Sequence, residues 1–412
     1  MRTYKNLSEV AKKYNVSSST VTMWIKATKE NKNNLLTINN GNKVRIIDNQ
    51  HNDAELHRLK EIGEKYRPTT HLKKLRVSDS FFKIFNDSQV SEIISSLETY
   101  KEIPHKYTYF DNGACIWSKY VDRSINENLV NTVTNTIELL STSIPFLIGR
   151  LNQSEKINLI DIGTGDGRTL KSFIEYLTSN DRLSNYIGVD ISQKMLSLLE
   201  DNFKLWFGKS VDFSTQLVDI NKQSLHETLF YLTNSLDTEK TIKNVVLFLE
   251  TTLENQREFD KTLLNIKESL GKNDKLILMQ SLMSMNSKTY FDFWTQESKS
   301  EEAKIPNQGT WIPELLGLSS DMYEPEYIYD DISKSRIISI KPIHETEIEF
   351  LSEKIHKVIT INKKERIILW RHNHHMLKDM ISNLNSIGLD VDYVVSSKDN
   401  AQALMSCRIS SK

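Results

Sequence analysis

A glycine-rich turn and two later carboxylates are the residues of this 412-residue chain whose types and spacing suggest chemistry. The turn is DIGTGDG at 161–167, and Asp190 and Asp219 each follow an apolar run further along the chain. Glycine lacks a Cβ, so the backbone of such a turn can approach a ligand closely. A carboxylate about 20 residues beyond the turn can accept both hydroxyls of a ribose. The spacing therefore predicts a site for a nucleotide-like ligand.

The elements around these residues predict an α/β fold with a parallel sheet. The segment 157–162 is apolar enough for a buried strand, and 168–178 has the spacing of an amphipathic helix. Further strands are expected at 186–189, just before Asp219, at 241–250 and at 275–279. Alternating strands and helices are typical of a doubly wound, Rossmann-like sheet, in which ligands bind at the carboxyl ends of the strands.

The details of the turn favour S-adenosylmethionine (SAM) over a dinucleotide. The third glycine comes earlier than in the G-x-G-x-x-G fingerprint. Asp166 lies within the turn, where it would repel a pyrophosphate at the helix N-terminus. Asp161 can face the ammonium group of SAM, while Asp219 is placed to bind the adenine amino group. Turn, acids and strands in this order resemble the class I SAM-dependent methyltransferases; the alternative is a Rossmann-like domain that has lost its site.

Five longer segments share a pattern with one family. They are EIPHKYTYFDNGACIW (102–117), FLETTLEN (248–255), WIPELLGLSSDMY (311–323), RIISIKPIHETEIEF (336–350) and the closing segment 383–409. In this order they resemble the SAM-dependent histidine-specific methyltransferase family, over roughly residues 90–410. The residues of the first two segments that match the family's motifs are Pro104, Lys106, Tyr109, Gly113, Thr252 and Asn255.

The resemblance implies a SAM pocket on the sheet and an acceptor pocket roofed by an inserted α+β subdomain at approximately 290–365. It places Tyr109 beside the acceptor and implies that Asn255 binds the acceptor's carboxylate end. Arg168 takes the place of a lysine in the family's turn and is expected to reach the SAM carboxylate. The expected cofactor-binding residues are Asp161, Gly163, Thr164, Gly165, Arg168, Asp190, Ile191 and Asp219.

Two departures from the family affect the acceptor site. The family's Gly-Ser before the matched threonine is Glu250-Thr251 here, and a glutamate narrows the space and adds charge. The acid and the serine with which the family grips an imidazole fall on Trp370 and His372. We therefore expect Glu250 to act as the catalytic base, with Tyr109 and His372 positioning the acceptor. That acceptor is expected to be a small, flat or cationic amine stacked on Trp370, rather than histidine.

The segment LWRHNHH at 369–375 has a second interpretation as a metal site. His372 and His374 would share one face of a strand, but the sequence offers no evident acidic partner. The two cysteines, Cys115 and Cys407, lack the spacing of a zinc site or a disulfide framework. A polar strand that lines the acceptor pocket is the favoured interpretation, and we expect no metal.

The first 50 residues predict a small winged helix-turn-helix. Two helical segments flank Asn15, a residue type that tolerates positive φ, and an Asn-Gly pair at 40–41 predicts a hairpin as the wing. The pattern resembles the excisionase or MerR-like helix-turn-helix. That resemblance implies that the second helix presents the following residues to double-stranded DNA: Ser18, Ser19, Thr20, Thr22 and Lys26. The alternative is a helical adaptor that only packs against a partner.

Charge and composition support this division of the chain. Residues 1–76 carry 16 Lys and Arg against seven Asp and Glu, and a basic segment suits a polyanionic partner. No run approaches the ~18 apolar residues of a membrane span, and the N-terminus lacks the apolar core of a signal peptide, so a cytoplasmic location is expected. We expect a helix and linker at 51–80 and the methyltransferase domain at 81–412.

Three functions fit these domains. Our prediction is a SAM-dependent methyltransferase for a small amine or amino-acid-like acceptor, with an N-terminal DNA-binding domain. The first alternative is a transcription regulator whose methyltransferase-like domain senses SAM without turnover. The second is a DNA-modifying methyltransferase, which is disfavoured because the chain has no D-P-P-Y or N-P-P-Y segment of the kind that handles an extruded base.

Overall fold

The computed structural model describes residues 7–30, 32–40, 43–65, 72–148, 155–223, 225–226, 242–283 and 307–410. It divides the chain into two compact units, Met1–Leu72 and Lys73–Lys412, and each unit is described by itself. Among the described residues, no helix is both long and apolar enough to cross a membrane.

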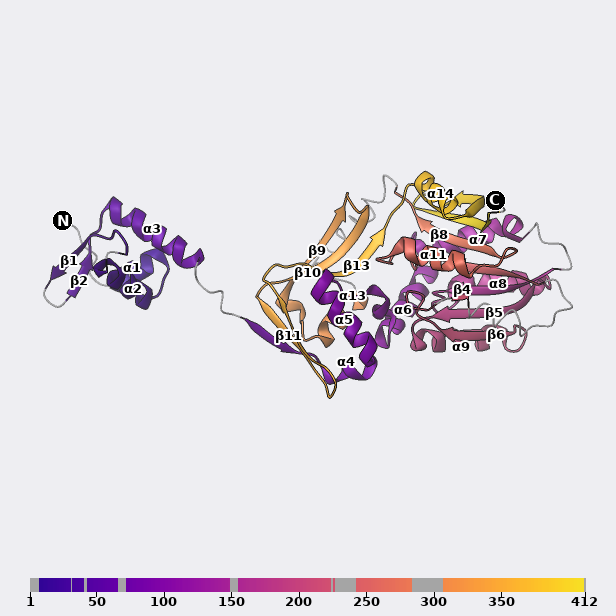
Figure 1. Cartoon of the computed structure of the whole chain (residues 1–412), viewed down its shortest axis with the longest axis horizontal. Coiled ribbons are helices and arrows are strands. Elements are labelled where there is room, and N and C mark those ends of the chain that lie inside the picture. Colours follow the sequence, from indigo (N-terminus) through magenta and orange to yellow (C-terminus); the bar gives the residue numbers. More distant parts are fainter. Residues whose placement is uncertain are drawn as a thin grey trace. The chain divides into compact units, whose positions relative to one another are not determined.

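The described residues of the N-terminal unit form three helices and a two-stranded hairpin (Figure 1). Its elements are α1 (Leu7–Tyr14), α2 (Ser18–Lys29), β1 (Thr37–Asn40), β2 (Lys43–Ile46) and α3 (Gln50–Lys65). Asn15, between α1 and α2, has a φ of 50°, as predicted for a tight turn between helices. The strands β1 and β2 pair antiparallel, which confirms the predicted hairpin. The apolar core of this unit includes Val10, Tyr14, Val21, Trp24, Ile46 and Leu56.

A mixed seven-stranded sheet organises the larger unit (Figure 1). In spatial order its strands are β14 (Leu389–Ser396), β15 (Gln402–Ile409), β8 (Lys275–Ser281), β7 (Ile242–Phe248), β4 (Lys156–Ile162), β5 (Leu183–Asp190) and β6 (Phe213–Leu217). The strands β4 to β8 run parallel, and β15 is antiparallel to both of its neighbours. The five strands expected from the sequence therefore form, and their carboxyl ends meet at one edge of the sheet.

Helices cover both faces of this sheet. They are α7 (Thr132–Ile148), α8 (Lys171–Ser179), α9 (Gln193–Phe207), α11 (Phe259–Ser269) and α14 (Leu377–Ser386). Ile157 and Leu159 of β4 pack into a core with α7, α8 and α9. Ile160 and Ile162 of the same strand pack into a second core with α11 and α14. Because both faces are buried, apolar residues on the central strands point to both sides of the sheet.

An α+β subdomain lies beside the carboxyl ends of the strands. Its strands are β3 (Lys73–Arg76), β9 (Tyr323–Asp330), β10 (Ser335–Pro342), β11 (Thr346–Leu351), β12 (His356–Ile361) and β13 (Ile367–Asn373). Its helical elements are α4 (Asp79–Ile84), α5 (Asp87–Tyr100), the 3-10 turn η1 (His105–Tyr109) and α13 (Asn307–Leu315), and α6 (Asn112–Asn126) follows η1. The strands form two three-stranded sheets, in the orders β13-β10-β9 and β12-β11-β3.

The subdomain draws on residues outside the insertion expected from the sequence. Residues 73–76, expected in the linker, form β3, which pairs in parallel with β11. The strand β13 follows the expected 290–365 and belongs to the subdomain because it pairs with β10. Residues 284–306, where the insertion is expected to begin, lie outside the described residues.

Gly167→Ala should destabilise the larger unit more than Gly388→Ala. Both glycines have positive φ, 80° and 87°, so alanine at either position strains the backbone; that strain costs about 1 kcal/mol. A Cβ at Gly167 would also lie 2.5 Å from Leu199 Cδ1, whereas at Gly388 the nearest atom is Lys267 Cε at 3.7 Å. Overpacking costs about 1–3 kcal/mol. Denaturant unfolding should show a difference of this size, and equal losses would contradict it.

Candidate active site

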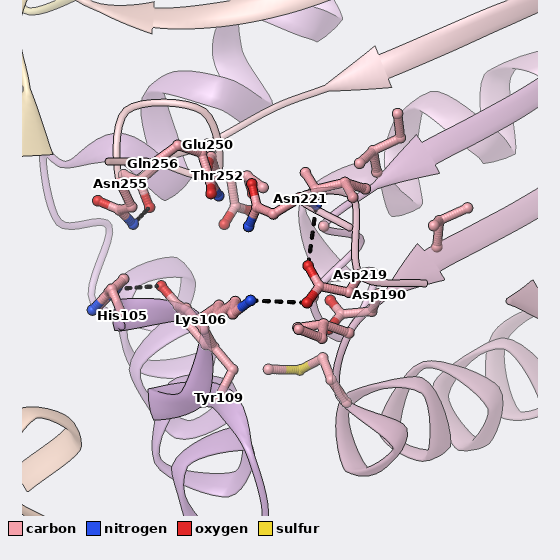
Figure 2. A pocket seen from close by; sticks show the side chains of 18 of the residues that line it. His105, Lys106, Tyr109, Asp190, Asp219, Asn221, Glu250, Thr252, Asn255 and Gln256 are labelled. Atoms are coloured by element: carbon pink, nitrogen blue, oxygen red, sulfur yellow. Dashed lines mark hydrogen bonds and ion pairs between the residues drawn. The ribbon is translucent and has the colours of Figure 1, made fainter. Parts of the chain in front are cut away.

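One cavity lies where the carboxyl ends of the parallel strands meet the α+β subdomain. Together with the space open to solvent at its mouth, it measures about 730 Å³. Figure 2 shows the loop after β7 and the turn η1 on opposite sides of this space, with Asp190 and Asp219 at a third side. The predicted site residues that line it are Tyr109, Gly163, Gly165, Asp190, Ile191, Asp219, Glu250 and Asn255. We call it the cofactor cavity.

The glycine turn lies directly against the loop after β7. Gly163 and Gly165 have φ values of 70° and 57°, which side chains rarely allow. A Cβ on Gly163 would lie 2.5 Å from Thr252 Oγ1, and one on Gly165 would lie 3.6 Å from Trp117 Nε1. The two glycines therefore keep the wall of the cavity thin enough for a ligand to approach the backbone.

Asp190 ends β5 inside the cavity. Its Oδ1 accepts a hydrogen bond from the Ser192 amide at 2.8 Å. Burial raises the pKa of this carboxyl to about 7, although bonds from backbone amides, among them those of Ser192 and Gly165, oppose the rise. Ribose hydroxyls or a nearby cation would stabilise the ionised form, so this position suits a nucleoside ligand with positive charge.

Asp219 follows β6 and is joined to the subdomain by an ion pair. Lys106 Nζ lies 2.8 Å from Asp219 Oδ2 and 2.6 Å from Glu92 Oε1. Asp219 Oδ1 accepts a bond from the Asn221 amide at 3.1 Å. Figure 2 shows this bond and the Lys106–Asp219 ion pair. A carboxylate has about four acceptor positions, so capacity for a ligand N–H remains. The contact between Asp219 and an adenine stays a prediction.

Asp161, Thr164 and Arg168 are not among the residues that line the cavity. The Asp161 carboxylate accepts from the Tyr186 hydroxyl at 2.8 Å, and Thr164 Oγ1 lies 2.6 Å from the same hydroxyl. Burial raises the pKa of Asp161 to about 6. Arg168 donates to Ser118 Oγ at 2.9 Å. All three side chains bond within the protein, and their contacts with SAM stay predictions.

Glu250 stands directly after β7 and lines the cavity. Its φ of 54° lies in the left-handed region, which glycine adopts easily; this accounts for the glycine in the resembling motif. Its carboxylate accepts from the Thr169 hydroxyl. Burial raises the pKa of Glu250 to about 7, and the charges of Asp166 and Asp161 act in the same direction. A carboxylate with this pKa can take up a proton at neutral pH.

Tyr109 faces Glu250 from the turn η1 (Figure 2). Its hydroxyl lies 3.1 Å from His105 Nε2, and its ring packs edge-on against Trp117. Burial raises the pKa of the Tyr109 hydroxyl, so the group keeps its proton at neutral pH. Tyr109 can therefore orient an acceptor by a hydrogen bond but cannot act as a base there.

A buried chain of hydrogen bonds runs from Asn255 away from the cavity. Asn255 Oδ1 lies 3.3 Å from His372 Nδ1, and His372 Nε2 lies 2.8 Å from Ser281 Oγ. Burial holds the pKa of His372 well below its usual value, so its ring is neutral. With the Asn255 oxygen as acceptor, Nδ1 carries the proton and Nε2 accepts from Ser281. His372 thus supports Asn255 from behind rather than lining the cavity.

Trp370 lies beside His372 on β13. The two rings stack with centroids 5.2 Å apart, and the indole is 6.4 Å from the His105 ring. Trp370 is not among the residues that line the cavity. Its stacking on an acceptor stays a prediction, whereas its stacking on His372 is present in the structure.

The sequence prediction does not include four residues of the site. His105 and Gln256 line the cavity; His105 lies within the segment 102–117 and Gln256 follows the segment 248–255, so these motifs could have pointed to them. Ser281 and Glu254 support the wall: the Ser281 amide donates to Glu254 Oε1 at 2.7 Å. No local pattern marks Ser281, because its contact with His372 joins positions 91 residues apart.

The histidine segment 369–375 shows no metal site. Within the described ranges, no group of three or more His, Cys, Asp and Glu is arranged to hold a metal ion. His374 Nδ1 lies 3.1 Å from the His372 carbonyl, so this nitrogen bonds to the backbone.

The sheet order, the glycine turn and the strand-end acids define a class I SAM-dependent methyltransferase, and SAM is its cofactor. The family described as "Histidine-specific methyltransferase, SAM-dependent" matches residues 89–408. The chain therefore belongs to this family, and the resemblance found in the sequence is confirmed over nearly the same residues. The match does not include the N-terminal unit.

Solved structures with a similar fold are distant in sequence. The magnesium protoporphyrin IX methyltransferase of Synechocystis PCC 6803, with bound SAH, is 12% identical, with a TM-score of 0.39 over 74% of this chain and 98% of that one. The 1,6-didemethyltoxoflavin-N1-methyltransferase of Burkholderia thailandensis is 12% identical, with a TM-score of 0.34 over 74% and 90%. No curated protein matches the sequence.

Asp190→Ala should weaken SAM binding measured by calorimetry. Each ribose hydroxyl that loses a charged partner costs about 1.5–3 kcal/mol. In the unaltered protein the affinity should rise with pH through about 7, because the carboxyl must release its proton to accept the hydroxyls. This dependence should be shallower in the variant. Asp201→Ala, which removes an exposed carboxylate on α9, is the control; equal binding by both variants would contradict the assignment.

Proposed function

We propose that this methyltransferase transfers the methyl group of SAM to the nitrogen of a small amine whose neighbouring carbon carries no carboxylate. The observation that carries the proposal is the position of Glu250 in the cofactor cavity, opposite Tyr109. A carboxylate there attracts an amine and repels a second carboxylate next to it.

The glycine turn and Asp190 are the residues that would hold SAM. SAM supplies a methyl group on a sulfonium, which the amine nitrogen attacks with its lone pair while the carbon–sulfur bond breaks and leaves its electron pair on sulfur. A small aliphatic amine is protonated at neutral pH, so its nitrogen must release a proton before its lone pair can attack. Glu250, with a pKa of about 7, can take that proton. The hydroxyl of Tyr109 can orient the amine, and alignment is the main requirement of such a displacement.

The hydrogen bonds that the Asn255 side-chain amide makes within the protein support an acceptor other than histidine. Its Oδ1 contacts His372, and its Nδ2 donates to Thr251 Oγ1 at 3.1 Å. The amide is thus engaged on both sides within the protein. His372 and Trp370 also replace the serine and the acid that grip an imidazole in the resembling motif, and an indole has no acceptor for an imidazole N–H.

Histidine should be a poorer acceptor than the best amine in a panel without α-carboxylates. An unpaired imidazole nitrogen costs about 1–3 kcal/mol, and Glu250 repels the α-carboxylate. Mass spectrometry of reactions with SAM measures both rates. Comparable turnover of histidine would overturn this acceptor class.

Glu250→Gln is the matched variant for the same assay. Its rate should fall by about 10²–10⁴, the usual contribution of a general base. The rate of the unaltered enzyme should rise with pH through about 7, because ionised Glu250 is the active form, and this rise should disappear in the variant. Full activity of the Glu250→Gln variant would show that Glu250 is not the catalytic base.

We also propose that the N-terminal unit binds double-stranded DNA. Ser18, Thr22 and Lys26 are exposed at i, i+4 and i+8 along one stripe of α2. Ser17 caps this helix by accepting from the Thr20 amide at 3.1 Å, and Ser17 Oγ also lies 2.7 Å from Ser19 Oγ. The stripe, the hairpin of β1 and β2 and the basic charge of residues 1–72, which carry 13 Lys and Arg against seven Asp and Glu, together support a groove-binding helix.

Lys26→Ala should reduce the salt dependence of DNA binding. Each phosphate contact releases counterions, so losing one should lower the slope of log affinity against log salt by about one unit. A duplex binding assay over several salt concentrations measures it. Lys209→Ala removes the same charge from an exposed position of the larger unit and should leave the slope unchanged. DNA affinity that does not change with salt concentration, or no binding to any duplex, would favour the adaptor alternative.

A further inference from the structure

A second cleft opens beside the cofactor cavity, and we call it the side cleft. It lies between α5, the segment 102–106 and the loops that follow β6 and β7, and measures about 1000 Å³ with the space open to solvent. The residues that line it and not the cofactor cavity include Glu92, Ser96, Tyr100, Glu102, Lys222 and Arg257.

The two spaces share part of their wall. His105, Lys106, Asn221, Asn255 and Gln256 line both of them. Figure 2 shows His105, Asn255 and Gln256 together on the side of the cofactor cavity away from Asp190. A molecule with one end beside Glu250 can therefore extend past these shared residues into the side cleft.

The side cleft presents two anchored cations. The Arg257 guanidinium lies 3.5 Å from the centroid of the Tyr100 ring and 2.9 Å from Glu102 Oε2. Lys222 Nζ lies 2.5 Å from Glu92 Oε2. The Arg257 and Lys222 side chains are 43% and 44% exposed, so each is held in place yet keeps N–H donors for a ligand.

The two spaces differ in their balance of charge. Asp190, Asp219 and Glu250 line the cofactor cavity, where Lys106 is engaged by two carboxylates. The side cleft has the carboxylates of Glu92, Glu102 and Glu258 against the cations of Lys106, Lys222 and Arg257. An anionic group is therefore repelled less in the side cleft than beside the reacting nitrogen, and the half-exposed Lys222 and Arg257 can contact it there.

We infer that the side cleft binds the far end of the methyl acceptor and that this end carries a carboxylate. The acceptor class is an elongated amine whose anionic group lies several bonds from the nitrogen. This inference rests on the proposed function, because it takes the nitrogen to lie beside Glu250.

Matched pairs of amines test the inference. The probes are 4-aminobutanoate, 6-aminohexanoate and 8-aminooctanoate against n-butylamine, n-hexylamine and n-octylamine. In the full-length protein with SAM, one of the longer amino acids should have a KM about tenfold lower than its alkylamine, with a similar kcat. Calorimetry with SAH-saturated protein should show the same preference in binding. Equal values within every pair would overturn the inference.

Variants of the two cations supply the second readout. Arg257→Gln and Lys222→Ala should each reduce the preference for the carboxylate probe several-fold, while leaving SAM affinity and the kinetics of the alkylamines unchanged. Lys354→Ala, which removes a 74% exposed lysine paired with Asp87 away from the cleft lining, is the control and should keep the preference. A preference that survives in both cleft variants would overturn the inference.

The two proposals fail in different ways. Methylation of the amines without any preference for a carboxylate would overturn the side-cleft inference and leave the proposed function standing. Binding of 6-aminohexanoate that depends on Arg257 and Lys222, without methylation of any amine, would overturn the amine chemistry and support the cleft as an anion site.

Discussion

Burial of carboxyl groups at the ends of parallel strands is the constraint on which the site depends. Burial raises the pKa of Asp190 and Glu250 to about 7 and that of Glu254 to about 8. Charging such groups is costly without partners, so backbone amides and hydroxyls surround them. A ligand with positive charge reduces that cost, whereas an anion adds to it. One electrostatic condition thus suits a sulfonium cofactor and favours the proposed acceptor, which presents its amine.

The turn η1 of the α+β subdomain bonds to the loops that follow β5 and β6. Lys106 of η1 reaches Asp219 after β6, and the Ser192 hydroxyl donates to the Tyr109 carbonyl at 2.7 Å. The same Ser192 oxygen caps α9 by accepting from the Met195 amide. Ser192, the N-cap of α9, therefore also holds the turn that carries Tyr109. A displacement of η1 would disturb both halves of the site together.

The sequence is informative where a function is encoded locally. The turn at 161–167 and the acids that follow β5 and β6 are short patterns, and the topology of a parallel sheet brings strand ends together whatever the helices contribute. The wall behind the acceptor is different. Asn255 and His372 are 117 residues apart and meet only because β13 packs beside the loop after β7. No local pattern could show that His372 supports this wall without lining the cavity.

The sequence did not predict the strand β3 for a related reason. Its four residues, KKLR, are mostly exposed and carry three charges, so they read as linker rather than strand. They become a strand because β11 offers an open edge in parallel register, from Thr346 against Lys73 to Glu349 against Arg76. The structure of this segment is thus decided by its neighbour.

The pairing of β3 with β11 determines where the N-terminal part of the chain can be truncated. A truncated protein that begins at 81, the boundary suggested by sequence, would lose β3 and leave the backbone N–H and C=O groups of β11 unpaired along a bare edge. Bare edges of this kind recruit strands from other molecules and promote aggregation. A truncation that begins at 73 keeps the edge covered. Truncation at 81 also removes Val77, which is buried in the subdomain core, and the start of α4 with its N-cap Ser78. Insolubility of the shorter fragment would therefore reflect these losses, and not a catalytic unit that requires the N-terminal helices to fold.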